Sequence, residues 1–200
     1  MRLGIDRNGV HIARLTVSPG CLFLLALGWY LGVGRMLRCC VAAAALHEGG
    51  HLLACWLLWI PVRRLQITCC GGVLETGRLL TGGEETAVAL AGPGVNLLLA
   101  FALLPLGNDP GGAVFLGVNL LLGLFNLLPL LPLDGGRAMH GLFSLFCPEE
   151  QVEGWLDAVT KVILGFLTAV GVLLGILGNP SLLLVVLLLR GKGEGRSLRE

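Results

Sequence analysis

Apolar runs of roughly bilayer length dominate this sequence and constrain its fold more than any other feature. Five of them could form membrane-crossing helices, at residues 18–34, 37–60, 85–106, 112–131 and 159–178. A helix needs about 17–25 predominantly apolar residues to cross the hydrocarbon core of a bilayer. Hydrophobic residues make up 55% of the 200 residues and charged residues only 14%, far from the composition of soluble domains. The sequence therefore predicts an integral membrane protein.

The basic residues between the runs predict how the chain is oriented. A sixth apolar run, Leu182 to Leu189, is shorter, and a crossing there would return the basic tail to the side of the N-terminal arginines. Short cytosolic loops carry an excess of lysine and arginine, so we place that side in the cytosol, although Arg35 and Arg38 break the pattern. The expected fold is an all-α polytopic membrane protein with about six transmembrane helices.

Residues 62–77, with the sequence VRRLQITCCGGVLETG, interrupt the helical pattern. Pro61 ends the preceding helix because proline lacks an amide hydrogen. Apolar and polar residues then alternate, and Gly71-Gly72 favours a tight turn between two short strands. We predict a small membrane-associated β-hairpin here.

Three ionisable residues, His47, Glu48 and His51, lie inside the second apolar run. Histidines four residues apart on a helix share one face, about 6 Å apart along the axis, and can bind one metal ion together. Glu48 lies about 100° around the helix and can reach a water molecule on that metal. An ionisable side chain within a span costs about 2.5–3.5 kcal/mol on insertion scales and usually marks a functional site. We therefore prefer a metal site to a hydrogen-bonded polar cluster.

Zinc suits this pair, because catalytic zinc sites use three protein ligands and leave one position for water. Asp134 is the candidate third ligand, in the sequence FNLLPLLPLDGGR at residues 125–137. Pro129 and Pro132 should break the fourth helix, and unwound backbone at membrane depth is tolerated where it lines a protein cavity. The alternative is an ordinary Asp-Gly turn. Zinc would activate water for attack on a peptide carbonyl, with Glu48 accepting the proton.

Two asparagines are candidates for substrate binding. Asn126 lies eight residues before Asp134, where an amide can hold a substrate backbone or an oxyanion, or instead form an interhelical hydrogen bond. Asn96 ends the sequence AGPGVN, whose glycines favour close packing against the helix with the histidines. We assign Asn96 to substrate binding or to positioning within the site.

The segments HEGGH, AGPGVN and FNLLPLLPLDGGR, in this order, resemble the motifs of the site-2 protease family of intramembrane zinc metalloproteases, peptidase family M50. The N-terminal sequence RNGVHI is similar to the opening found in members of the stage IV sporulation branch of this family. This resemblance covers residues 7 to about 140. It implies that His47, His51 and Asp134 bind one zinc ion per chain, that Glu48 is the general base and that Asn126 meets the substrate. It also implies that a substrate segment could pair with the hairpin at residues 64–76 by strand addition.

Two positions depart from the pattern of the family. Gly49 stands where a bulkier apolar residue is usual, and VSPG, at 17–20, stands where relatives often have a histidine before the proline. Neither departure removes a ligand. We expect a single integral membrane protease domain over residues 1–200, with a catalytic core at about 37–140, C-terminal helices at 158–190 and a polar tail at 191–200.

The expected activity is that of a zinc-dependent membrane endopeptidase acting in regulated intramembrane proteolysis. Its substrate would be a membrane-associated protein, and the resemblance to the family implies a sigma-factor precursor or an anti-sigma factor. An inhibitory or regulatory membrane protein is a further expected partner. The site would open to the cytosolic side of a bacterial cell membrane.

Two other functional classes are weighed against this one. A non-catalytic metal-binding scaffold with the protease fold would have no need of Glu48. An ion transporter would spread its ionisable residues over several spans, whereas these converge on one site. The net charge of +1 and the scattered basic residues exclude a nucleic-acid partner.

Overall fold

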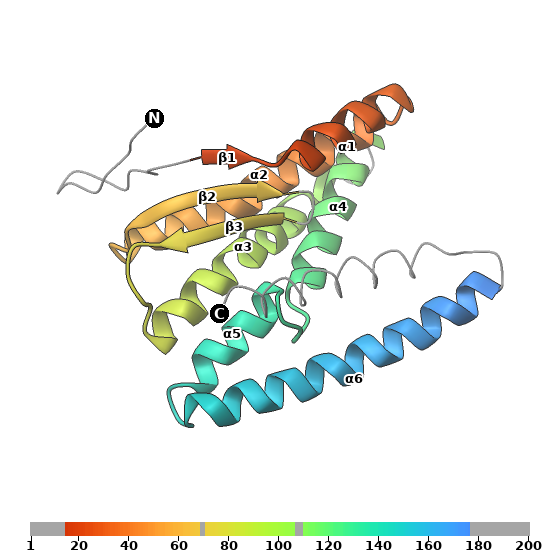
Figure 1. Ribbon diagram of the computed structural model, residues 1–200. Helices are drawn as coiled ribbons and strands as arrows, with labels where there is room; N and C mark the ends of the chain where they lie inside the picture. The colour runs from red at the N-terminus through yellow and green to blue at the C-terminus, as the bar shows by residue number, and fades with distance from the viewer. Residues whose placement is uncertain (1–14, 69–70, 107–109, 177–200) are drawn as a thin grey trace.

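The computed structural model describes residues 15–68, 71–106 and 110–176 (Figure 1). In chain order, its elements are β1 (Leu15–Val17), α1 (Pro19–Tyr30), α2 (Gly34–Leu57), β2 (Val62–Thr68), β3 (Gly71–Thr76), α3 (Gly82–Ala102), a 3-10 turn (Leu104–Leu106), α4 (Pro110–Asn126), α5 (Asp134–Phe143) and α6 (Glu149–Ile176). The predicted helical membrane architecture is confirmed in its coarse form.

Three of the described helices are long and apolar enough to cross a membrane, judged by length and composition. They are α2, α3 and the part of α6 from Glu149 to Leu173. The expected spans at 18–34 and 112–131 are shorter helices, α1 with 12 residues and α4 with 17. Gly32 follows the end of α1 with a φ of 76°, a conformation in which helices commonly end. The expected sixth crossing at 182–189 and the polar tail lie outside the described residues.

Helix α6 begins earlier than expected. The chain is helical from Glu149 onward, so the C-terminal helical region does not start near 158, the position expected from the sequence. Glu149 and Glu150 lie in the first turn, where carboxylates interact favourably with the positive end of the helix dipole. The charged segment thus forms the start of this long helix.

The predicted hairpin belongs to a three-stranded sheet with the order β1-β2-β3. Strands β2 and β3 are antiparallel, and β1 pairs in parallel with β2, with Leu15 opposite Leu65. The prediction that Gly71 and Gly72 form the turn is wrong, because they are the first residues of β3. Gly71 has a φ of 113°, which side-chain-bearing residues rarely adopt.

Close contacts between helices position the interior polar residues. A Cβ atom at Gly50 of α2 would lie 2.6 Å from the carbonyl oxygen of Ala91 on α3, so only glycine lets these backbones come so near. A small apolar cluster joins the end of α2, the start of β2 and α3 through Cys55, Val62 and Val88. The sheet is thereby fixed against the same two helices (Figure 1).

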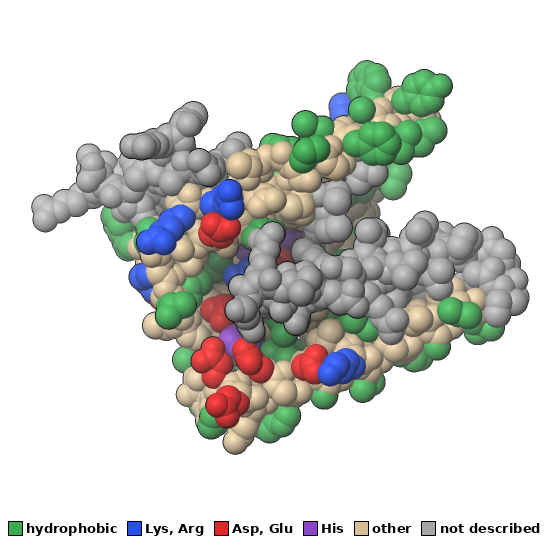
Figure 2. Space-filling view, viewed as in Figure 1, with side chains coloured by type: hydrophobic (Ala, Val, Ile, Leu, Met, Phe, Trp, Pro, Cys, Tyr) green, Lys and Arg blue, Asp and Glu red, His purple; other side chains and the backbone are tan. Residues whose placement is uncertain are grey.

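The face drawn in Figure 2 has apolar side chains concentrated at one end and charged side chains at the other. Hydrophobic side chains gather over the outer part of α1, where Phe23, Trp29 and Tyr30 are all exposed. Charged side chains gather at the opposite end, over the start of α6 and the nearby sheet. Such an apolar exterior is what a lipid environment requires and water disfavours.

Candidate metal centre

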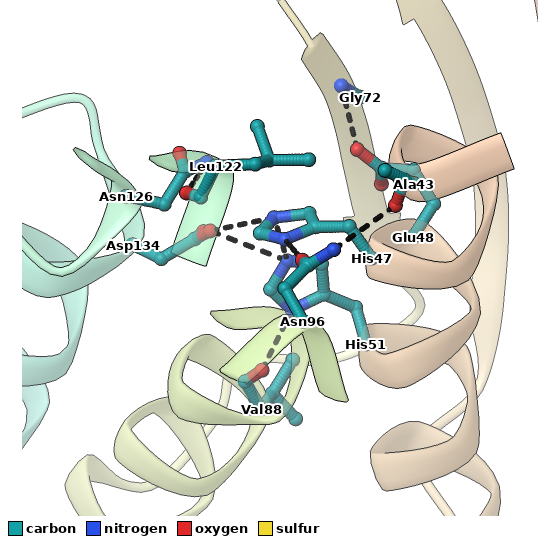
Figure 3. Close-up of polar contacts among 10 residues, drawn as sticks. All are labelled: Ala43, His47, Glu48, His51, Gly72, Val88, Asn96, Leu122, Asn126 and Asp134. Atoms are coloured by element: carbon teal, nitrogen blue, oxygen red, sulfur yellow. Dashed lines mark hydrogen bonds and ion pairs between the residues drawn. The ribbon is translucent and has the colours of Figure 1, made fainter. Parts of the chain in front are cut away.

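Two helices bring His47, His51 and Asp134 together inside the protein (Figure 3). Oδ2 of Asp134 lies 3.0 Å from Nε2 of His47 and 3.4 Å from Nε2 of His51, and the two Nε2 atoms are 3.2 Å apart. Donors placed tetrahedrally about 2.0–2.1 Å from one zinc ion would be about 3.3 Å apart. The three side chains are buried, so the residues present fit a single metal ion of that size.

Hydrogen bonds to the far side of each imidazole select its tautomer. Nδ1 of His47 lies 2.6 Å from Oδ1 of Asn96, and Nδ1 of His51 lies 2.7 Å from the carbonyl oxygen of Val88. Both partners are acceptors, so each Nδ1 carries the hydrogen and each Nε2 presents a lone pair to the site. The imidazoles are therefore oriented for metal binding by residues of α3.

A buried pair of amides supports His47. Nδ2 of Asn96 donates to the carbonyl oxygen of Ala43 and to Oδ1 of Asn119, which orients the Asn96 amide with its oxygen toward His47. Asn119 in turn donates to the carbonyl oxygen of Phe115 within α4. Both asparagines are 0% exposed, which gives Asn96 a positioning contact, while its expected contact with substrate stays a prediction.

The sequence reasoning missed Asn119. Its signal was an amide in the middle of an apolar helix, and such amides commonly form hydrogen bonds between helices. The partner lies 23 residues away on α3, so the pairing depended on the packing of α3 against α4.

Asp134 is the first residue of α5, after an irregular segment that follows the end of α4 at Asn126. The predicted break of the helix before the prolines is confirmed. Gly136 packs against this segment, since a Cβ there would lie 2.8 Å from the backbone nitrogen of Leu131. The chain therefore turns tightly enough to place the Asp134 carboxylate opposite α2.

Glu48 and Asn126 lie beside the three metal-site residues (Figure 3). Oε1 of Glu48 accepts a hydrogen bond of 2.8 Å from the backbone amide of Gly72 on β3. Nδ2 of Asn126 donates back to the carbonyl oxygen of Leu122, one turn earlier in α4, at 3.0 Å. Figure 3 draws Asn126 on the Asp134 side of the centre and Glu48 on the side of the sheet. Their expected roles with water and substrate stay predictions.

The glycines of AGPGVN differ in their surroundings, which allows a matched test. A Cβ at Gly92 would overlap Nε2 of His51 and lie 3.0 Å from Cε1 of His47, whereas a Cβ at Gly94 would meet nothing within 4 Å. We expect Gly92→Ala to lower metal affinity at least about tenfold, the size of effect seen when a metal ligand loses its orientation. Gly94→Ala should bind metal normally, and equal metal affinity in both variants would contradict this geometry.

No family model matches the chain. Stage IV sporulation protein FB of Bacillus subtilis is 33% identical over 150 residues, which cover 70% of this chain and 51% of that protein. Zinc metalloprotease MJ0392 of Methanocaldococcus jannaschii is 29% identical over 110 residues, 51% of this chain and 32% of that protein. A solved structure, the site-2 protease from Methanocaldococcus jannaschii, has the same fold, with a TM-score of 0.69 at 20% identity over 94% of this chain and 92% of that one.

The chain belongs to the site-2 protease family. Family membership and the long apolar helices together identify an integral multi-pass membrane protein. Its buried candidate metal site contains two histidines and an aspartate. The chain spans about half or less of the length of the curated relatives described above.

Proposed function

We propose that this site-2 protease family member is an intramembrane zinc endopeptidase that cleaves a membrane-associated protein. The observation that carries the proposal is the metal centre of His47, His51 and Asp134, whose donor atoms are 3.0–3.4 Å apart, with the Glu48 carboxylate on the neighbouring residue of α2. Two neutral imidazoles and one carboxylate form a donor set that zinc favours over magnesium or calcium.

Each residue of the centre has a distinct part in this proposal. His47 and His51 hold the metal through Nε2, in orientations that Asn96 and Val88 maintain. Zinc bound there would act as a Lewis acid that activates water and polarises a peptide carbonyl. Glu48 takes the proton from the attacking water and passes it to the departing amine.

The substrate in this proposal is a membrane protein that becomes extended near the site. An extended segment can add to β3, which has one strand neighbour in the described sheet. Asn126, which is partly buried beside the centre, would then hold the substrate backbone. We place the charged end of the molecule, with Arg63, Arg64 and Arg78, in the cytosol of a bacterial cell.

The Bacillus subtilis relative is named for a stage of sporulation, and its name does not give a substrate. By analogy with a stage IV sporulation protein, a sigma-factor precursor or an anti-sigma factor is the first candidate, with an inhibitory membrane protein as regulator. The alternative is a metal-binding scaffold that retains the fold without activity, and the presence of Glu48 argues against it.

Metal removal tests the proposed function directly. The purified protein in lipid vesicles should contain about one zinc ion per chain and cleave at least one member of a panel of single-span proteins. A chelator should stop cleavage because it withdraws the Lewis acid, and added zinc should restore it. The measurements are metal analysis and gel detection of the fragments.

Two results would count against the proposal. Absence of zinc from protein purified without chelator would remove the proposed cofactor. Zinc at full occupancy with no cleavage of any member of the panel would favour the scaffold.

A further inference from the structure

We propose that the backbone amide of Gly72 positions Glu48 for catalysis, and that residue 72 must be glycine for this reason. The inference rests on the proposed function of Glu48 as the base and adds a positioning residue from a different structural element. Its physical basis is one hydrogen bond and one close approach between β3 and α2.

The hydrogen bond fixes one oxygen of the carboxylate. The Gly72 amide donates to Oε1 of Glu48 at 2.8 Å, in a partly buried position. A glutamate side chain has three rotatable bonds, so an anchored Oε1 removes most of its freedom and leaves Oε2 to accept a proton. A charge-assisted hydrogen bond of this kind is stronger than one between neutral groups.

The close approach explains why glycine is needed. A Cβ on residue 72 would overlap Cδ and both carboxylate oxygens of Glu48. The requirement is spatial, because Gly72 does not have a positive φ, in contrast to Gly71 with its φ of 113° and open surroundings. The two adjacent glycines therefore serve different purposes, one for the backbone at the start of β3 and one for the space that Glu48 occupies.

The hairpin holds this amide in place relative to α2. Gly72 is paired with Ile67 on β2, and β2 begins at Val62 in the apolar cluster with Cys55 of α2. Because α2 also carries His47 and His51, the sheet sets the position of the base relative to the metal ligands. Any displacement of β3 is transmitted to Glu48.

Gly72→Ala tests the positioning role. We expect kcat to fall about a hundredfold, the size of effect that a misplacement of about 1 Å can produce, with KM changed less than about threefold. The zinc content and the midpoint of thermal unfolding should stay at their wild-type values. Gly83→Ala is the matched control, because a Cβ at this exposed glycine of α3 meets nothing within 4 Å, and its kcat should not change.

A second measurement needs no substrate and separates this inference from the proposed function. In Glu48→Ala the Gly72 amide loses its acceptor, so its hydrogen exchange should accelerate at least about tenfold relative to wild type. Unchanged exchange would overturn the inference even if the protein cleaves substrate. A wild-type kcat in Gly72→Ala, or loss of zinc from this variant, would also overturn the positioning role of Gly72. Lack of cleavage by the wild type would instead contradict the proposed function. The exchange measurement would then still test whether Gly72 contacts Glu48.

Discussion

Glu48→Gln is expected to retain zinc and to lose proteolysis. Glutamine has the size of glutamate, and its side-chain oxygen can still accept the hydrogen bond from Gly72, while His47, His51 and Asp134 are unchanged. Its amide cannot take a proton from water at neutral pH. General base catalysis contributes about 10²–10⁴-fold to a rate, so cleavage should fall by about that factor.

The measurement pairs metal analysis with cleavage of one single-span substrate by each protein. Glu150→Gln supplies a matched control, because it makes the same chemical change at an exposed position of α6, and it should cleave at the wild-type rate. Undiminished cleavage by Glu48→Gln would show that another group accepts the proton. Loss of zinc from Glu48→Gln would mean that the carboxylate contributes to metal binding.

The parts of this site that could be predicted from the sequence are those governed by local geometry. A spacing of four residues on a helix brings His47 and His51 together whatever the rest of the fold does. The prolines before Asp134 predicted the end of α4 for an equally local reason. The three residues of the candidate metal centre could therefore be predicted from the sequence before any tertiary contact was known.

The contacts that orient these residues depend on packing between helices and strands, so they could not be predicted from the sequence. Asn96 reaches His47 across 49 positions of the chain, and Gly72 reaches Glu48 across 24. The three-residue strand β1 forms only because β2 offers it an edge, and no periodicity marks so short a segment. The sequence also suggested a turn at Gly71 and Gly72, but both residues belong to β3. Gly71 adopts a positive φ, and Gly72 leaves room for the Glu48 side chain.

Asp134→Ala is expected to lower zinc affinity more than about a hundredfold. Loss of a residue that only orients a ligand costs about 10–100-fold, and Asp134 would itself be the third ligand and the anionic one. Its Oδ2 lies within 3.4 Å of both histidine Nε2 atoms, and the next two residues of α5, Gly135 and Gly136, have no side chain that could replace it. Zinc titration against a competing chelator measures the affinity.

Asp134→Asn separates charge from coordination. An amide oxygen can occupy the same position but carries no net charge, so its zinc affinity should lie between those of the alanine variant and the wild type. Asp157→Asn, at an exposed residue of α6 paired with Lys161, controls for the chemical change and should bind zinc as the wild type does. Wild-type affinity in Asp134→Ala would require a different third ligand, and equal losses in both Asp134 variants would show that the negative charge, rather than the oxygen atom alone, holds the metal.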